Sequence, residues 1–410
     1  MGNVYTNITA FAGGEGLDLS SFEEALKEHY KGGVVEDLVY KNRPLMAMMP
    51  KYSKFGGRVL PVPVMNANPQ NRSANFSDAQ KTGAAYQAGS IKSFLLQRVR
   101  DYSIARIDGE TLEASKGDAN AFMQAATAEI DGAMSAIGRS LAGACYRNGS
   151  GVIGNAASVA AGPPIEITLT NPENVTQFEV GMILQDPTAA REGTVQAVDR
   201  SNGKLEMAAG STLIATDDLV VKGDQPVAGS NSKVSGLDAW ITDTSLSSPF
   251  FGVDRSVDPS RLAGLKHNGS AQPIEEALID GASLVGREGG RPDHCFMGFE
   301  KFSELVKALG SKVTYVDAKS PAGLGFKALE LHAPYGTMKV IPDADCQPDT
   351  AWLLQMDTWS LNSLGECPRI LTHDGNKSLR ISDADAIEVR IGYYANIACK
   401  APGWNCKVTL

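Results

Sequence analysis

The chain has 410 residues, of which 43% are apolar and 21% charged, and its formal net charge is −9. This length predicts roughly two to three domains, and the acidic balance argues against a dedicated nucleic-acid-binding protein. Glycine, with 42 residues, exceeds its usual share of about 7% and follows no period, which indicates many loops and bends. The sequence has no signal segment at its start and no apolar run of about 18 residues, so neither secretion nor a membrane span is expected.

The N-terminal segment has the pattern of a polar, glycine-rich arm followed by a helix. Two serines precede an acidic first turn, which is typical of a helix N-terminus. Apolar residues then recur at every fourth position from Phe22 to Leu38. The sequence therefore predicts an amphipathic helix from Phe22 to about Tyr40, whose apolar stripe needs a partner surface.

Two extended segments separated by a polar stretch predict a long β-hairpin. Pro61 and Pro63 exclude a helix and a central strand over Arg58–Val64, and the chain returns in a second extended run over 90–107. One face of that return is expected to carry Phe94, Leu96, Tyr102 and Ile104. A hairpin this long cannot bury itself, so it must pack on another surface.

Five cations lie along this hairpin of an otherwise acidic chain. They are Lys51, Lys54, Arg58, Arg72 and Lys81. Two interpretations stay open: they are solvated loop charges, or they form a basic limb that lies over the acidic surface of a neighbouring copy.

The strongest helical pattern begins near Asp118 and runs to about Arg147. Apolar residues recur at three- and four-residue spacing from Phe122 to Cys145, and the pair at 148–149, Asn-Gly, is a typical helix end. Thirty residues at 1.5 Å each give roughly 45 Å, against an average helix of about 11–12 residues. This helix is expected to form the spine of an elongated domain.

The remainder of the chain divides into three patterns. Short β-like runs with turn signals, among them Phe178–Leu184, predict a small barrel or sandwich. Alternating helices and strands then predict an α/β region with helices at Ile274–Val285 and Phe299–Leu309 and a strand at Cys295–Met297. The end of the chain predicts strands at Ala386–Cys399, with Ile387, Val389, Ile391 and Tyr393 on one face, and at Lys407–Leu410.

The chain carries no recognisable catalytic or metal-binding motif. Its five histidines lie far apart, and the sequence contains no phosphate loop, dinucleotide fingerprint or nucleophile elbow. Acidic pairs such as Asp343 and Asp345 are explained by turn chemistry. The six cysteines are expected to be buried free thiols. The sequence therefore predicts no enzyme, no cofactor and no metal site.

The order of these elements resembles the major capsid protein of tailed bacteriophages, whose fold is shared with the herpesvirus capsid floor and with encapsulins. The segments Ala144 to Gly151 and Tyr394 to Trp404 also resemble this family. The resemblance implies an α+β fold with the following parts: an N-terminal arm with a helix (1–50), an extended β-hairpin loop (51–116), the spine helix of a peripheral domain (117–160), an inserted β-barrel or sandwich domain (161–235), an α/β axial domain (236–358), and C-terminal strands that complete the peripheral domain (359–410).

The resemblance also implies a function. Subunits of this family self-assemble into pentamers and hexamers that form the icosahedral head of a double-stranded DNA phage, which encloses DNA without reading its sequence. Implied partners are a separate scaffolding protein, a portal, and a decoration or cement protein, with assembly in the host bacterial cytoplasm and no membrane. We expect neither N-terminal processing nor a covalent crosslink between subunits.

Candidate contacts between subunits combine the first helix and the hairpin cations. They are Phe22, Leu26, Lys51, Lys54, Arg58, Arg72 and Lys81. Two alternatives from other classes stay open: an encapsulin-like protein compartment shell, and a β-rich phage surface or adhesion protein.

Overall fold

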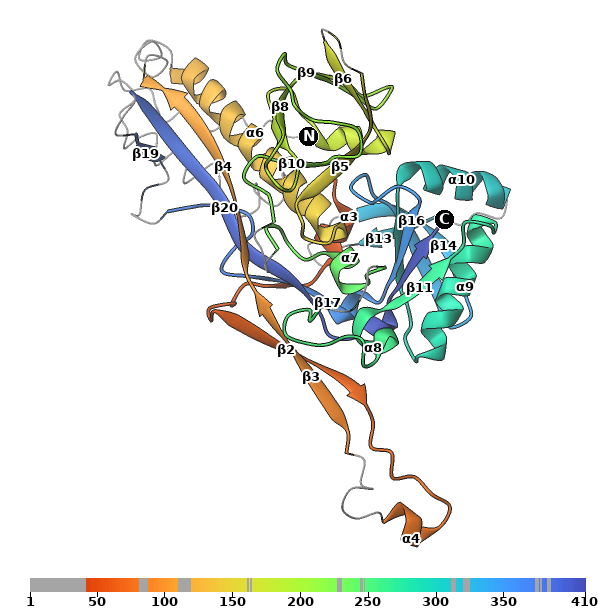
Figure 1. Cartoon of the computed structure of the whole chain (residues 1–410). Coiled ribbons are helices and arrows are strands. Elements are labelled where there is room, and N and C mark those ends of the chain that lie inside the picture. The colour runs from red at the N-terminus through yellow and green to blue at the C-terminus, as the bar shows by residue number, and fades with distance from the viewer. Residues whose placement is uncertain are drawn as a thin grey trace. The chain divides into compact units, whose positions relative to one another are not determined.

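A computed structural model of the chain (Figure 1) describes residues 42–80, 88–109, 119–160, 162, 164–226, 231–243, 246, 248–310, 315–319, 325–372, 376, 378–381 and 385–410. The predicted N-terminal helix, with Phe22 and Leu26, and the hairpin residue Lys81 lie outside these ranges. The chain forms two compact units. One takes in Tyr102–Gly138 and Pro368–Gly392, and the other takes in Tyr40–Asp101, Arg139–Cys367 and Tyr393–Leu410.

The predicted spine is the helix α6 (Ala119–Tyr146), whose 28 residues give a length of about 42 Å. Its buried side chains keep the three- and four-residue spacing of the sequence pattern: Ile130, Met134, Ile137, Leu141 and Cys145. Beyond the helix end, Gly149 has φ +87°, a left-handed conformation that glycine adopts without steric cost. The prediction of a long spine helix is confirmed.

A six-stranded sheet is built around the long strand β20 (Ala386–Cys399). Its other strands are β1 (Lys51–Tyr52), β4 (Val99–Asp108), β17 (Trp359–Ser363), β18 (Arg369–Ile370) and β19 (Ser378–Arg380). The predicted strand is confirmed, and its other face is buried as well as the predicted one. Residues of both parities in β20 are buried, Glu388 included, and Arg390 is its one exposed residue.

A seven-stranded sheet carries the α/β region. In spatial order its strands are β11 (Leu265–Asn268), β21 (Cys406–Thr409), β16 (Thr350–Leu354), β12 (His294–Met297), β15 (Gly336–Pro342), β14 (Gly325–Ala333) and β13 (Tyr315–Lys319). The helices α9 (Ile274–Arg287) and α10 (Phe299–Leu309) pack on this sheet around a core that includes Leu278, Leu305 and Val408. Both predicted helices and the predicted strand are confirmed.

The last strand departs from the expected domain plan. The segment 359–410 was expected to complete the peripheral sheet, and β17 and β20 do pair with each other. However, β21 pairs with β11 and β16 in the seven-stranded sheet. The C-terminal segment therefore supplies strands to two different sheets.

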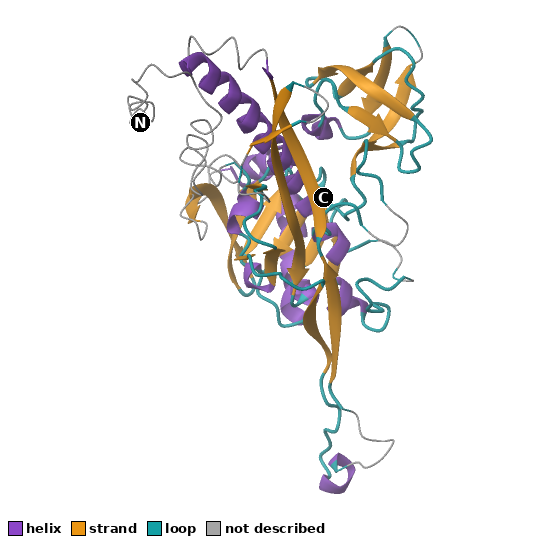
Figure 2. Ribbon diagram, turned by 90° about the vertical axis from the view of Figure 1, so that its left-hand side faces the viewer, coloured by secondary structure: helices purple, strands orange, loops and turns teal. Residues whose placement is uncertain are grey.

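A closed barrel confirms the predicted small β-rich domain (Figure 2). Its strands, in order around the barrel, are β10 (Asp218–Val221), β5 (Val152–Ala160), β6 (Ile165–Leu169), β9 (Lys204–Met207), β8 (Glu192–Asp199) and β7 (Ile183–Gln185). Its first strand, β5, lies before the segment 161–235. The run expected over 178–184 contains a strand only from Ile183 onward, because a 3₁₀ turn, η4 (Pro172–Gln177), precedes it.

Short helices complete the described chain. They are α3 (Pro44–Met48), α4 (Phe76–Ala79), α7 (Leu237–Trp240) and α8 (Pro259–Ala263), with 3₁₀ turns η6 (Met356–Thr358) and η7 (Pro402–Trp404). Among the residues that the structure describes, no helix is both long enough and apolar enough to cross a membrane.

Candidate assembly interface

The predicted hairpin is a two-stranded antiparallel sheet of β2 (Val59–Ala67) and β3 (Ser90–Gln97). With no third strand beside it, the backbone edge of β2 tolerates the two prolines, which donate no hydrogen bond. Alternate side chains lie on opposite faces of such a pair. The hairpin therefore has two faces with different side chains.

The inner face of the hairpin is anchored on an aromatic cluster. Phe94 is fully buried, and its ring centroid lies 5.0 Å from that of Trp240 and 6.1 Å from that of Phe250. The guanidinium of Arg255 lies 4.2 Å from the centroid of Phe250 and donates a hydrogen bond of 2.8 Å to the carbonyl of Ala239. These edge-on aromatic contacts and the cation–π contact hold the base of the hairpin.

The outer face of the hairpin is apolar and exposed. Met65 pairs across the strands with Ile91, and Pro61 pairs with Leu95. The exposed fractions are 59% for Met65, 62% for Ile91 and 48% for Leu95. A contiguous apolar patch on a soluble chain marks an interaction site. The sequence carries this signal, because residues 59–65 are apolar at both parities, although the contacts predicted on the hairpin were charged residues.

The predicted apolar face of the return strand changes side at Arg98. Phe94 and Leu96 are buried as expected, whereas Tyr102 is 49% and Ile104 55% exposed. Arg98 separates β3 from β4, donates a hydrogen bond to the carbonyl of Phe55 and lies 5.0 Å from the centroid of its ring. From there on, the buried positions are Ala105 and Ile107. The prediction of one continuous face was therefore wrong for Tyr102 and Ile104.

The structure places the predicted cations apart from one another. Lys51 lies on β1, which pairs with β17, and Lys54 forms an isolated bridge to Leu364. Arg58 immediately precedes β2, and Arg72 follows it in the polar stretch. All four are exposed. They therefore lie on the segments before and after β2, and none of them lies within β2 or β3.

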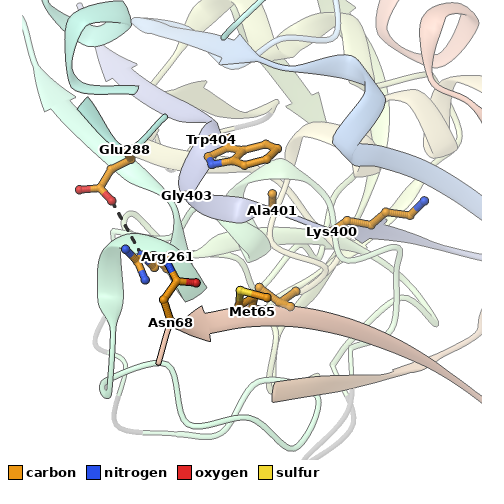
Figure 3. A pocket seen from close by; sticks show the side chains of 9 residues that line it. Met65, Asn68, Arg261, Glu288, Lys400, Ala401, Gly403 and Trp404 are labelled. Atoms are coloured by element: carbon orange, nitrogen blue, oxygen red, sulfur yellow. Dashed lines mark ion pairs between the residues drawn. The ribbon is translucent and has the colours of Figure 1, made fainter. Parts of the chain in front are cut away.

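A cavity of about 370 Å³ lies where the hairpin meets the body (Figure 3). Met65 and Asn68 line it from the hairpin, Arg261 from α8, and Trp404 from η7. In Figure 3, the indole of Trp404 and the side chain of Met65 lie on opposite sides of the opening. The cavity thus joins the exposed apolar face of β2 to an exposed aromatic ring.

A buried carboxylate fixes the segment that leads into the hairpin. Asp343 is 1% exposed and accepts hydrogen bonds from the Tyr146 hydroxyl (2.7 Å), the Leu45 backbone N–H (3.3 Å) and the Asp345 backbone N–H (3.0 Å). Burial, followed by the charge of Asp345, raises the pKa of Asp343 to about 6. The hydrogen bond from the Asp345 backbone N–H belongs to the turn that the sequence predicts. The Asp343 carboxylate also links α3 to the end of α6.

The second carboxylate of this pair extends the cluster to the barrel. Asp345 lies 3.6 Å from the guanidinium of Arg43 and accepts a hydrogen bond of 3.0 Å from the Gln177 side chain. Burial raises the pKa of Asp345 and lowers that of Arg43. Buried charges of this kind need their partners, so Asp343 and Asp345 together hold α3, α6 and η4 in place.

The six thiols are buried and free, as predicted. Burial raises the pKa of Cys399 and of Cys406 to about 12, which is opposite to the shift that a nucleophilic cysteine needs. Across the described part of the chain, no group of three or more histidine, cysteine or acidic side chains has the arrangement of a metal site.

Comparison with known proteins extends the structural description. Residues 218–378 match the family model of the SU10 major capsid protein. The capsid asymmetric unit of cyanophage A-1(L) aligns with a TM-score of 0.50 at 10% identity, covering 90% of this chain and 92% of that chain. None of the curated proteins matches the sequence of this chain.

Two mycobacteriophage structures align over more of the chain. For Mycobacterium phage Adephagia the TM-score is 0.44 at 12% identity, with 96% of this chain and 98% of that chain covered. For Mycobacterium phage Bobi the TM-score is 0.43 at 11% identity, with 96% and 99% covered. Neither score reaches 0.5, so the fold assignment depends on the cyanophage structure.

The α+β fold, with its spine helix, projecting hairpin and barrel, is the fold of a phage capsid subunit. Within this fold, residues 218–378 are similar to the SU10 major capsid protein.

Proposed function

We propose that copies of this chain form pentamers and hexamers that close an icosahedral head around double-stranded DNA. The supporting observation is the outer face of the hairpin, where Met65, Ile91 and Leu95 stay exposed although the inner face is anchored. A subunit of a closed shell must bury in its neighbours the surface that it cannot bury itself. The outer face has this property.

We propose that the contacts predicted from the sequence act at the rim of the same interface. They are the cations Lys51, Lys54, Arg58, Arg72 and Lys81 of the hairpin segment, together with the apolar residues Phe22 and Leu26 of the N-terminal segment. Charges at the rim of an interface steer association and set its orientation more than they add affinity. Substitution of these lysines and arginines should therefore slow assembly at low salt, and less so at high salt, where the charges are already screened.

Two charges on the outer face test the proposed contact. The double variant Met65→Lys, Ile91→Lys should remain folded, because both side chains are exposed, and should fail to form particles. The matched control is Val180→Lys, which charges a 65% exposed valine of the barrel and should still assemble. Size-exclusion chromatography and negative-stain microscopy report assembly, and circular dichroism reports folding. Normal particles from the double variant would refute the role of this face.

Nucleic acid inside native particles would distinguish a phage head from an encapsulin-like compartment. We propose a DNA-filled head whose inner surface binds its contents weakly, supported by the net charge of −9, since strong phosphate binding would oppose packaging and ejection. Particles that contain an enzyme cargo and no DNA would contradict this. An isolated adhesin would form no closed particles.

The partners of assembly are proposed from the resemblance to tailed-phage capsid proteins. They are a separate scaffolding protein, a portal, and a decoration or cement protein, with assembly in the host bacterial cytoplasm. Expression of this chain alone should then yield irregular or mixed-size shells, and co-expression with a scaffolding protein should make them uniform. Uniform, portal-free shells from the chain alone would remove the need for a scaffold.

The parts of the chain take family roles in this proposal. The segment 236–358 is assigned to the axial domain, and the hairpin and N-terminal segment are assigned to overlap with neighbours. The barrel is assigned to the outer surface or to contacts between capsomers. Particles boiled in denaturant should run as single chains, because we propose no covalent crosslink between subunits. A ladder of multimers would overturn that statement.

A further inference from the structure

We propose that the hairpin tip of one subunit inserts Phe76 into the cavity at the hairpin base of the next subunit. This inference depends on the proposed assembly into capsomers and names a specific contact within it. It is supported by an exposed aromatic side chain, a cavity of suitable size and a pair of opposite charges, all on described residues.

The inserting side chain is held at the tip by a short, well-defined turn. The helix α4 has Asn75 as its N-cap, whose side chain accepts a hydrogen bond of 3.3 Å from the Ser77 backbone N–H. Phe76 follows directly and is 79% exposed, the largest exposed fraction among the described large apolar side chains. No residue of α4 is buried. The turn thus displays a phenyl ring that the chain itself leaves in solvent.

The receiving cavity has room for a phenyl ring and offers it two apolar side chains among polar ones. Its volume is about 370 Å³, whereas an apolar cavity of about 150 Å³ is enough to hold benzene. Trp404, 40% exposed, and Met65, 59% exposed, line it. A ring placed between an indole and a thioether would gain aromatic and sulfur–aromatic contacts. The cavity has room for the ring and for a neighbouring carboxylate.

The charges at both surfaces are complementary. Arg261 lies 3.9 Å from Glu288, which neutralises it at one end of the cavity (Figure 3). Lys400 also lines the cavity, and it makes no ion pair with any residue that the structure describes. Asp78, two residues after Phe76 in the first turn of α4, likewise makes no ion pair with a described residue. Insertion of Phe76 would bring this carboxylate beside the Lys400 ammonium group.

The position of the tip makes the contact one between copies. Asn68 is the last hairpin residue that lines the cavity, and α4 begins eight residues later, at the end of the hairpin away from α8 (Figure 1). Tip and cavity are different surfaces, so the contact between two copies is heterologous. A heterologous contact generates a ring when its rotation closes, which is the geometry that a capsomer requires.

A disulfide tests the contact inside assembled particles. The double variant Phe76→Cys, Ala401→Cys places one thiol at the tip and one in the cavity lining, while the native cysteines are buried. On mild oxidation of its particles, we expect disulfide-linked multimers up to the size of a capsomer on a non-reducing gel. The matched control, Phe76→Cys with Val180→Cys on the exposed barrel, should give single chains, as should each single variant.

A charge swap tests the same contact without a new thiol. Asp78→Lys should reduce the yield of particles by roughly tenfold or more, and adding Lys400→Glu should restore it. This inference would be overturned if particles form normally, the cysteine pair stays unlinked and the charge swap has no effect. That outcome would leave the proposed function standing. A link from the tip cysteine to a different protein would also overturn the inference. Failure of the unaltered chain to form any particle would instead refute the proposed function.

Discussion

Replacement of Tyr146 by phenylalanine isolates one hydrogen bond of the buried cluster around Asp343. Tyr146 is 1% exposed, and its hydroxyl lies 2.7 Å from the Asp343 carboxylate. Phenylalanine keeps the ring and removes the donor. A hydrogen bond to a charged group contributes about 1.5–3 kcal/mol and one between neutral groups about 0.5–1.5 kcal/mol. At pH 8, where Asp343 is ionised, Y146F should therefore lower the free energy of unfolding by about 2 kcal/mol.

The cost of Y146F should depend on pH. The pKa of Asp343 is raised to about 6, above the value of about 3.9 for an unfolded chain. The folded state therefore binds this proton more tightly, and its stability falls as the pH rises from about 4 to about 6. The Tyr146 hydroxyl opposes that loss because its hydrogen bond lowers the pKa of Asp343. In Y146F the pKa of Asp343 should rise further.

The expected size of the pH effect follows from these values. At pH 5 the Asp343 carboxyl is largely protonated in both proteins, so only a neutral hydrogen bond is lost, at a cost of about 1 kcal/mol. The difference of about 1 kcal/mol between pH 8 and pH 5 corresponds to a rise of about 0.7 unit in the pKa of Asp343 in the variant.

Urea denaturation of unassembled subunits at the two pH values measures this effect. Tryptophan fluorescence is a suitable signal, because Trp240, Trp352 and Trp359 are buried. The variant D343N is the control, since the effect of Y146F should lose its pH dependence in that background. An equal cost at pH 5 and pH 8 would refute the reasoning that the Tyr146 hydroxyl stabilises an ionised carboxylate.

Three further predictions concern stability and reactivity. The Lys233 ammonium lies 2.7 Å from Asp101 and 3.0 Å from Asp224, and its side chain is 9% exposed. K233M should destabilise the subunit by about 3 kcal/mol, because it leaves two partly buried carboxylates without this cation. K233R should restore part of that loss in urea titrations. Gly132 is exposed in α6 with open space around it, so G132A should raise the free energy of unfolding by about 0.5–1 kcal/mol. In contrast, G236A should lower the melting temperature, because a Cβ at Gly236 would overlap with carbonyl oxygens of α6. The six thiols should react with maleimide only after denaturation, as followed by intact mass, since all of them are buried; rapid labelling of the folded chain would contradict their placement.

Local patterns predicted the elements whose signal is local. The spine helix α6 needs only a continuous apolar stripe, and its buried residues from Ile130 to Cys145 follow the spacing of the sequence. The helices α9 and α10 and the strand β12 were predicted for the same reason. In each case the pattern lies within one segment, and the partner surface does not change its period.

The sequence pattern of a strand did not predict which distant strand pairs with it. The strand β5 belongs to the barrel because Asn155 pairs with Asp218, far along the chain, and nothing within β5 itself indicates that partner. The four-residue strand β21 likewise joins β11 and β16 rather than β20. Short strands carry little periodic information, so their sheet is decided by tertiary contacts.

A single residue also overturned the prediction of one continuous apolar face on the return strand. Side chains of a strand alternate between faces, so one added residue moves every later side chain to the opposite face. Arg98 is that residue between β3 and β4, held by its contacts with Phe55. Tyr102 and Ile104 therefore lie exposed, whereas the sequence grouped them on one face with the buried Phe94 and Leu96.

The difference between charged and apolar side chains explains why the sequence predicted only part of the candidate interface. Lysine and arginine side chains are stable in water almost anywhere on a surface, so the predicted cations at Lys51, Lys54 and Arg58 carried little information about where a neighbour binds. Exposed apolar side chains carry more, because leaving them in water forgoes about 25 cal/mol for each Å² that a partner would cover. Met65 and Ile91 form such a surface on a hairpin whose other face is already buried. In a protein that assembles, the fold of one chain leaves some apolar residues of its strands exposed. These residues define where the next copy binds.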